Sequence, residues 1–338
     1  MKLTIRQIAE MAGVSVTTVS QILNHKGRRF SAETRQRVND IVEKYQYKPD
    51  FFASNLITRH SKTIGMIVPD VTDSFFSKIV EGAERYTNPL GYMLVLCNSH
   101  HELEKEIQLL QQLADRSVEG VILATPNILP EEYSVDSEFS QTMPLGLIDR
   151  GINQRDNGRL MVKEYEGAYQ AVSYLVKSGH YNIGLIKENT DYYQLEERYN
   201  GYYQALKDAG ILFKHENVVT ADLTVEGGYY AAQQLLKQKH LTAIFCSNDA
   251  MAMGCYRAIY EQNYKIPDDI SVIGFDGLSF SKFMNPPLTT IKQPVFDIGF
   301  TAAKFIVDAI EFPEQRIPNK IFETKLIFRE SVKNLASE

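Results

Sequence analysis

Several kinds of segment are missing from this chain of 338 residues, and each absence narrows the classes of protein to which it can belong. No run of about eighteen apolar residues occurs, so no membrane-spanning helix is expected. The N-terminus already reads as a folded motif rather than an export signal, which predicts a protein that stays in the cytoplasm. Low-complexity runs are also absent, and 44% of the residues are hydrophobic, which is ample for well-packed cores.

Sequence signatures of catalysis and of metal binding are missing as well. The chain has no Gly-x-Ser-x-Gly turn for a nucleophile, no Gly-x-x-x-x-Gly-Lys loop for phosphate and no His/Cys cluster. Its cysteines, Cys97, Cys246 and Cys255, lack metal-ligand spacing, and we expect them to be small buried hydrophobic residues in a reducing compartment. We therefore expect no enzyme, no metal site and no cofactor.

What the chain does have, at its start, is a pair of short helical patterns separated by a glycine. Apolar residues recur at helical spacing at Ile5, Ile8, Ala9 and Ala12. Thr4 and Gln7 form a capping box in front of this first helix. Gly13 permits a positive φ at the turn, and Ser15 can cap a second helix through its hydroxyl.

The second helix would pack Val19, Ile22 and Leu23 against the first. Its outer face and N-terminal end then carry Val16, Thr17, Thr18, Ser20 and Gln21. This arrangement is typical of a helix-turn-helix, whose second helix presents side chains to the DNA major groove. A third amphipathic helix is expected after Ser31, with Val38, Ile41, Val42 and Tyr45 on one stripe. The alternative for this segment is a small three-helix cap with no role on DNA.

Charge supports the DNA-binding interpretation. Residues 1–60 contain ten Lys and Arg against five Asp and Glu, whereas the remaining residues contain 26 basic and 37 acidic side chains. A basic head on an acidic body concentrates phosphate attraction at one end of the chain, so DNA binding should weaken with salt.

The pattern changes after the head. Residues 49–58 predict a hinge helix of about two turns, which is marginal alone in water and should order only against a partner. From residue 63 onward, short apolar strands alternate with helical stretches. The expected strands are Thr63–Pro69, Tyr92–Asn98, Gly120–Thr125, Leu145–Asp149, Ile183–Lys187, Ala243–Cys246 and Ile270–Phe275. Apolar strands separated by helices predict parallel sheets covered on both faces, here in two βαβ lobes.

Several strings in the chain together resemble the LacI (lactose-repressor) family, and within it the ribose operon repressors. They are the head motif, the Ala-x-x-Leu of the hinge at Ala53 and Leu56, and the body strings at 64–69, 247–252, 272–276 and 287–294. The resemblance implies a homodimeric, ligand-controlled repressor of pseudo-palindromic operator DNA, with a body like a periplasmic sugar-binding protein of two doubly wound parallel-sheet lobes.

The same resemblance implies the domain organisation. An all-α DNA-binding domain would span 1–48, a hinge helix and linker 49–61, and a sugar-binding and dimerisation domain 62–338. Lobe one would hold about 62–161 plus 293–322, and lobe two about 162–292 plus 323–338. The ligand would bind in the cleft between them.

Roles on DNA follow from the family motif. Val16, Thr17 and Gln21 would read bases, and Gln21 replaces an Arg common in relatives, which changes the preferred base from guanine to adenine. Thr4, Thr18, Ser20 and Asn24 would contact phosphates, with Ser15 at the helix start. In the hinge, Ala53 and Asn55 would contact DNA, and Leu56 would be the apolar wedge that enters the minor groove and bends the duplex. The alternative for Leu56 is a packing residue of the linker.

The body carries residue types suited to a sugar, which needs aromatic faces and bidentate polar side chains. Many of them follow strands, where ligands bind in open α/β sheets. They resemble the pocket of ribose-binding proteins, and the candidates are Phe75, Phe76, Asn127, Asp149, Arg150, Arg198, Asp249, Phe275 and Gln293. Asp276 could equally be structural at its loop.

These observations predict a repressor of a sugar-utilisation operon, controlled by a ribose-like pentose in the cleft. Within the regulator class, a sucrose- or fructose-responsive repressor stays open. So does a carbon catabolite regulator with a phosphorylated carrier protein as co-repressor. A secreted binding protein would share the body but not the DNA-binding head.

Overall fold

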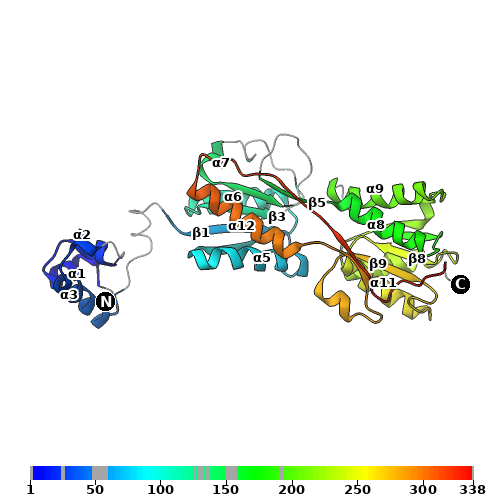
Figure 1. Cartoon of the computed structure of the whole chain (residues 1–338), viewed down its shortest axis with the longest axis horizontal. Coiled ribbons are helices and arrows are strands. Elements are labelled where there is room, and N and C mark those ends of the chain that lie inside the picture. Colours follow the sequence, from blue (N-terminus) through cyan, green and yellow to red (C-terminus); the bar gives the residue numbers. More distant parts are fainter. Residues whose placement is uncertain are drawn as a thin grey trace. The chain divides into compact units, whose positions relative to one another are not determined.

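The computed structural model describes residues 3–23, 27–47, 60–124, 127, 133, 138–148, 158–189 and 193–336. The chain divides into two compact units, Met1–Ser61 and Lys62–Glu338 (Figure 1). The described α-helices are α1 (Ile5–Ala12), α2 (Val16–Leu23), α3 (Ala32–Lys44), α5 (Ser74–Thr87), α6 (Leu103–Asp115), α7 (Glu138–Thr142), α8 (Glu164–Lys177), α9 (Tyr193–Asp208), α10 (Val225–Leu235), α11 (Asp249–Glu261) and α12 (Val295–Glu311). The described strands are β1 (Thr63–Val68), β2 (Met93–Asn98), β3 (Gly120–Ala124), β4 (Leu145–Ile148), β5 (Arg159–Val162), β6 (Ile183–Glu188), β7 (Val218–Ala221), β8 (Ala243–Cys246), β9 (Ser271–Asp276), β10 (Thr289–Lys292), β11 (Lys320–Phe322) and β12 (Lys325–Ile327).

In the first unit, α1 begins with the expected capping box. The backbone N–H of Thr4 donates to Gln7 Oε1 at 2.8 Å, and the Gln7 N–H donates back to Thr4 Oγ1 at 3.4 Å. Gly13 ends the helix in the left-handed conformation, with a φ of +63°. The buried core of this unit consists of Ile8, Ala9, Ala12, Val19, Ile22 and Val38. The expected apolar spacing is therefore confirmed for α1 and α2.

The third helix begins where expected and ends one residue before the last position of its expected apolar stripe. Ser31 caps α3 by accepting from the Thr34 N–H at 3.1 Å. Tyr45, expected on the buried stripe, follows the last helical residue and is 47% exposed. Tyr47 packs partly against the core instead. The chain has already left the helical path at Tyr45, so helical spacing no longer sets its direction.

The second unit contains two sheets, which Figure 1 shows with helices on both faces. The first has the order β11-β5-β4-β3-β1-β2, and all its pairings are parallel. The second has the order β12-β10-β9-β8-β6-β7, parallel except for the β10–β12 pair. Strands β1, β3, β8 and β9 are buried along their whole length. The expected α/β class with covered parallel sheets is confirmed.

Alternation along the strands divides each sheet between two cores, because successive side chains point to opposite faces. In β8, Phe245 packs with α8 and α9, whereas Ile244 and Cys246 pack with α10 and α11. In β3, Ile122 faces α5 and α12, whereas Leu123 faces α6. Each sheet is thus sandwiched between helix layers, and the carboxyl ends of its strands form one open edge.

The chain passes from one sheet to the other after β5, after β10 and after β11. The first crossing leads into α8, and the second leads into α12. Residues at these crossings are therefore close to the carboxyl ends of strands in the second sheet, where the candidate site lies.

Candidate functional site

The first unit presents α2 with one buried and one accessible side. Ser15 accepts from the Thr18 N–H at 3.1 Å and so caps the helix as expected. Its buried residues are Val19 and Ile22, while Ser15, Val16 and Thr17 are exposed. Thr18, Ser20 and Gln21 are partly exposed, and Thr4 is exposed at the start of α1. The candidate DNA contacts Asn24, Ala53, Asn55 and Leu56 lie outside the described residues.

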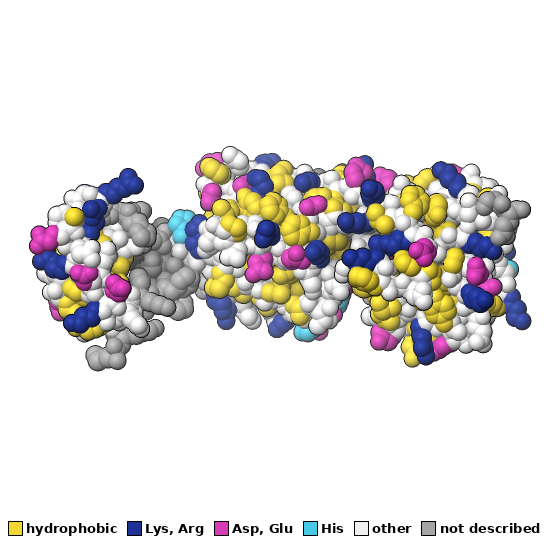
Figure 2. Space-filling model, turned by 60° about the horizontal axis from the view of Figure 1, so that its bottom comes forward, with side chains coloured by type: hydrophobic (Ala, Val, Ile, Leu, Met, Phe, Trp, Pro, Cys, Tyr) yellow, Lys and Arg dark blue, Asp and Glu magenta, His cyan; other side chains and the backbone are white. Residues whose placement is uncertain are grey.

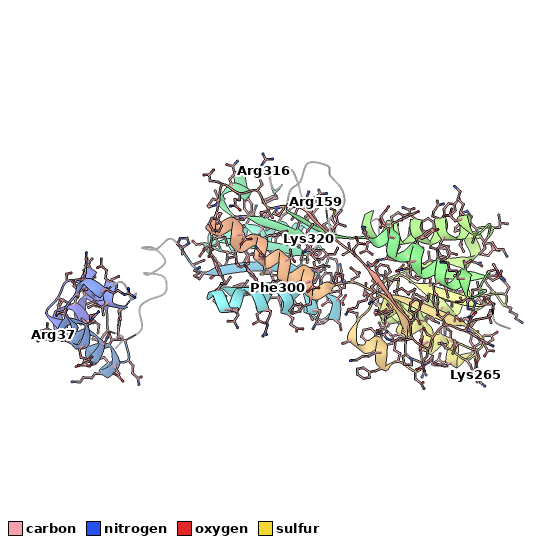
Figure 3. The ribbon with its side chains drawn as sticks, in the orientation of Figure 1. Arg37, Arg159, Lys265, Phe300, Arg316 and Lys320 are labelled. Atoms are coloured by element: carbon pink, nitrogen blue, oxygen red, sulfur yellow. The ribbon has the colours of Figure 1, made fainter. Side chains whose placement is uncertain are left out.

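Basic side chains on this unit point outward. Arg6, Arg28, Arg29, Arg37 and Lys44 are exposed, and Figure 3 shows Arg37 directed away from the helical core. In the view of Figure 2, basic and acidic side chains are interspersed on the visible face of this unit. Exposed Lys and Arg side chains of this kind are suited to contacts with DNA phosphates.

The second unit gathers polar side chains at the carboxyl ends of four adjacent strands. Glu188 ends β6, Ser247 follows β8, Asp276 ends β9 and Gln293 follows β10. These strands are neighbours in the order β10-β9-β8-β6. Parallel strands end at a common edge, so residues far apart in sequence meet there. Arg198 from α9 reaches the same edge.

Arg198 is the centre of this group and is only 4% exposed. Its Nε donates to Glu164 Oε2 at 2.7 Å, and its Nη1 donates to the Ser247 carbonyl at 2.5 Å. Its Nη2 lies 3.6 Å from Asp276 Oδ1, which also accepts from Gln293 Nε2 at 2.8 Å. We call Arg198, Glu164, Glu188, Asp276 and Gln293 the Arg198 cluster.

The Phe275 ring supports the guanidinium from one side. The Arg198 guanidinium carbon lies 4.0 Å from the centroid of this fully buried ring. A cation over an aromatic face is attracted by the ring quadrupole and loses freedom to rotate. Phe275 therefore contributes to the cluster by fixing the plane of Arg198.

Several buried oxygen atoms of the cluster have no hydrogen-bond partner. They are Glu164 Oε1, both carboxylate oxygens of Glu188 and Gln293 Oε1, with Ser247 Oγ beside them. Buried polar atoms are nearly always paired, so each unpaired one calls for an explanation. Apart from the Ser247 hydroxyl, all these atoms are hydrogen-bond acceptors. They could accept hydrogen bonds from a ligand rich in O–H or N–H donors.

Burial dominates the electrostatics of the cluster. It raises the pKa of Asp276 well above the ordinary value, although Arg198 opposes this. Burial also raises the pKa of Glu188, opposed by the nearby Ser247 hydroxyl and by Arg198. For Arg198, burial favours the neutral form, but Glu164 and Asp276 outweigh it and raise the pKa. Perturbed pKa values of this kind are typical of functional sites.

The backbone at Asp276 is also unusual. Its φ of +101° is one that non-glycine residues seldom adopt, and Gly277 follows with a φ of +70°. These two residues turn the chain sharply at the end of β9. Strained backbone is often retained where a side chain must be aimed at a binding site.

The structure places the other candidate ligand residues in varied surroundings. Asp249 is fully buried under the β9–β10 turn and accepts from Thr290 Oγ1 at 2.6 Å and the Leu278 N–H at 2.7 Å. Burial raises the pKa of Asp249 to about 7. Its hydrogen bonds tie the start of α11 to β10, and its only described link to the cluster is its charge near Asp276.

The candidates in the first sheet divide similarly. Phe75 is buried in the α5–α12 core, and Phe76 packs edge-on to it with ring centroids 5.3 Å apart. Asn127 donates to Glu106 Oε1 at 3.0 Å. Asp149 and Arg150 lie outside the described residues. Of the nine ligand candidates, the structure brings Arg198, Phe275 and Gln293 together.

Sequence reasoning missed Glu164, Glu188 and Ser247, and left Asp276 open. A usable signal was present for Glu188, because it is the last residue of an apolar strand and so points to the ligand edge. Glu164 gave no such signal, because it is the first residue of α8, and the chain reaches α8 from β5 of the other sheet.

No group of metal-binding side chains is found among the described residues. In that same part of the chain, no helix is both long and apolar enough to cross a membrane. Cys97, Cys246 and Cys255 are free thiols, the last two buried and the first half-buried.

Two family matches together cover most of the chain. Residues 4–50 match the bacterial regulatory proteins of the lacI family. Residues 61–330 match the periplasmic binding proteins and sugar binding domain of LacI family.

Among curated relatives, the HTH-type transcriptional repressor PurR of Pectobacterium atrosepticum is 36% identical over 91% of this chain and 90% of its own. PurR of Mannheimia succiniciproducens is 34% identical over 98% of this chain and 99% of its own.

Two solved structures are also similar. A LacI family regulator from Enterococcus faecium with bound ribose has a TM-score of 0.72 and 30% identity, over 81% of this chain and 99% of that chain. The lac repressor dimer bound to operator has a TM-score of 0.88 and 26% identity, over 98% of this chain and all of that chain.

Proposed function

As a member of the LacI family, the chain is a DNA-binding transcriptional repressor, and we propose that it represses a sugar-utilisation operon under the control of a ribose-like pentose. The observation that carries this proposal is the Arg198 cluster, with its unpaired buried acceptors at the ends of four adjacent strands. Pentose hydroxyls are donors that would satisfy these acceptors. The similar regulator with bound ribose supports the same ligand.

The proposed mechanism couples the ligand to the hinge. A sugar that contacts residues from both sheets would bind more tightly to one relative arrangement of the two lobes than to another. The equilibrium between these two arrangements would shift by that difference in affinity. That shift would separate two hinge helices that stabilise each other on operator DNA. The sugar would thus act as an inducer.

We propose a homodimer as the functional unit. The edge strand β2 exposes apolar side chains, with Met93 58% and Leu96 41% exposed. Exposed apolar edge strands are prone to pairing with another chain, and proteins usually cover them. Figure 2 also shows apolar side chains on the visible face of the larger unit.

A purine is the second candidate effector, because curated relatives at 34–36% identity are PurR repressors. Purine N–H groups would also pair with the unsatisfied acceptors of the cluster. Hypoxanthine offers fewer donors than a pentose, so we keep the sugar as the main proposal.

A thermal-shift screen of the full-length protein with ribose, fructose, sucrose, hypoxanthine and guanine tests the proposal. A ligand that binds only the folded state raises the melting temperature. We expect ribose to give the largest increase. An increase with a purine and none with any sugar would replace the pentose by the second candidate.

A further inference from the structure

Lys62 is the residue at which the chain enters the first sheet, and its backbone is unusual there. It is the first residue of the second unit and directly precedes β1. Its φ is +48°, in the left-handed region that residues with a side chain seldom adopt. The turn before β2 also has a positive φ, but there the residue is Gly91, which adopts it without strain. A lysine at position 62 therefore needs a reason that a turn alone does not supply.

The Lys62 side chain makes a contact that glycine could not make. Its ammonium nitrogen lies 4.0 Å from the centroid of the Tyr92 ring. Tyr92 is only 4% exposed and belongs to the same buried core as Ile64 of β1 and Ile79 of α5. A cation over an aromatic ring is attracted by the ring quadrupole. Lys62 is thus anchored on a side chain that the core holds in place.

The backbone at Lys62 is fastened on both sides of β1. The Lys62 carbonyl accepts from the Met93 N–H at 2.8 Å, at the start of β2, and the Lys62 N–H donates to Glu119 Oε1 at 2.5 Å. The Glu119 N–H donates to the Thr63 carbonyl at 2.9 Å, directly before β3. Strands β2 and β3 are the two neighbours of β1 in the sheet. Residue 62 therefore keeps a fixed orientation relative to three strands.

We propose that Lys62 is a positioning residue for operator binding, because it fixes the direction in which the chain passes from the DNA-binding head into the first sheet. Strained backbone persists only where the surrounding structure enforces it, and it is often retained where it serves a function. This inference rests on the proposed homodimer, since a fixed direction matters when two heads must reach two half-sites at once.

The physical effect is on the effective concentration of the second head. Once one head of a dimer has bound its half-site, binding of the other is an intramolecular event that depends on the stiffness of the connection. A firmly held residue 62 removes one joint at which each head could turn away from its half-site. Loosening this joint lowers the affinity for a complete operator and leaves the affinity of a single head unchanged.

The experiment measures the binding of full-length proteins to two DNA probes by fluorescence anisotropy. The probes are an operator selected from random DNA by the wild type, and one of its half-sites in a duplex too short for a second head. We expect wild type to bind the operator at least about 100-fold more tightly than the half-site. Lys62→Gly combined with Glu119→Ala removes the ring contact and the acceptor of the residue-62 N–H. This double variant should narrow the ratio about tenfold, by weakening operator binding alone.

Further variants separate positioning from stability. Glu119→Gln keeps an acceptor oxygen for the residue-62 N–H and should keep the wild-type ratio. Glu104→Ala, on the exposed start of α6, removes a carboxylate from another element and should keep the ratio as well. Lys62→Gly alone replaces the double variant if that protein does not fold, and should also narrow the ratio.

The possible failures are distinguishable. An unchanged ratio in the folded double variant overturns this inference and leaves the homodimer standing. Equal weakening on both probes also overturns it, because loss of folded protein, unlike loss of positioning, affects the two probes alike. A wild type that binds both probes equally overturns the homodimer together with the inference.

Discussion

Asp249 and Asp276 lie near each other in the second sheet, yet their hydrogen bonds differ. Asp249 accepts from Thr290 and from the Leu278 backbone, all within one lobe. Asp276 faces Arg198 and Gln293 beside several unpaired acceptors. The first carboxyl therefore holds backbone elements together, while the second belongs to a surface that a ligand can complete.

Asp249 should make stability depend on pH. Burial raises its pKa from 3.8 to about 7 in the folded chain, so folding favours the protonated form. Its stabilising contribution is present below about pH 4 and is lost as the pH rises through about 7. In urea unfolding at several pH values, Asp249→Asn should lose this dependence. Parallel pH curves for the two proteins would contradict the assignment.

Gln21 should carry sequence information on DNA. A bidentate contact to adenine contributes roughly 1–3 kcal/mol of discrimination, so Gln21→Ala should weaken operator binding by about that amount per half-site and leave random DNA nearly unaffected. Fluorescence anisotropy on both DNAs measures this. Thr18→Ala, at an expected phosphate contact, is the control and should weaken both equally. Equal losses for Gln21→Ala would make it a backbone contact.

At this scale, sequence reasoning located Arg198 and Gln293 but not their carboxylate partners. Both are residue types that suit a sugar and lie near expected strand ends. Glu164 could not be found in the same way, because its contact with Arg198 joins α8 to α9 through tertiary packing. Asp249 looked like a ligand residue because it follows a strand, yet its carboxylate turns inward to Thr290.

At the scale of elements, α5 and α12 pack unusually closely through two glycines. A Cβ on Gly299 would lie 1.9 Å from the Ile79 carbonyl oxygen, and one on Gly82 would lie 2.1 Å from that of Phe296. Phe300, labelled on α12 in Figure 3, packs edge-on against Tyr86 of α5 at 5.0 Å between centroids. This contact fixes the helix that follows the second crossing of the chain.

Gly299→Ala should therefore destabilise the protein, although alanine favours helix. The clash with backbone forces α5 and α12 apart, and overpacking typically costs about 1–3 kcal/mol. Glu311→Ala, exposed on the same helix, should change the unfolding free energy by less than about 0.5 kcal/mol. Chemical denaturation measures both. A Gly299→Ala protein as stable as wild type would show that the two helices can separate freely.

The hinge gives a second prediction at this scale. Leu56→Ala keeps helix propensity but removes most of the apolar wedge, so operator affinity and DNA bending should both fall. Ribose affinity should not change, since the Arg198 cluster is formed by other residues. Gel shift and calorimetry measure the two. Unchanged operator affinity would reduce Leu56 to a linker residue.

Helices and strands could be predicted where the apolar pattern of the sequence agrees with the burial of the segment in the fold. The apolar strands β1, β3 and β8 lie within a residue of their expected limits, because burial on both faces leaves a continuous apolar run. Strands β7 and β11 gave no such run, since they are short edge strands in which most residues are exposed or half-buried. Their pairing is set by the neighbouring strand rather than by their own sequence.

At the scale of the whole molecule, function requires that the Arg198 cluster and the operator-binding head influence each other. Allosteric control is a coupling free energy between two sites, and it acts in both directions. Ribose should weaken operator binding, and operator should weaken ribose binding by the same factor.

Operator titration by anisotropy, with and without ribose, tests this coupling most directly. The comparison is wild type against the double variant Arg198→Ala with Glu164→Ala, which removes both partners of this buried ion pair. Both proteins should bind operator equally without ribose. Ribose should lower operator affinity for wild type alone, because the variant loses about 1.5–3 kcal/mol of charge-assisted hydrogen bonding to the sugar. An equal ribose response in both proteins would contradict the assignment of the Arg198 cluster as the effector site.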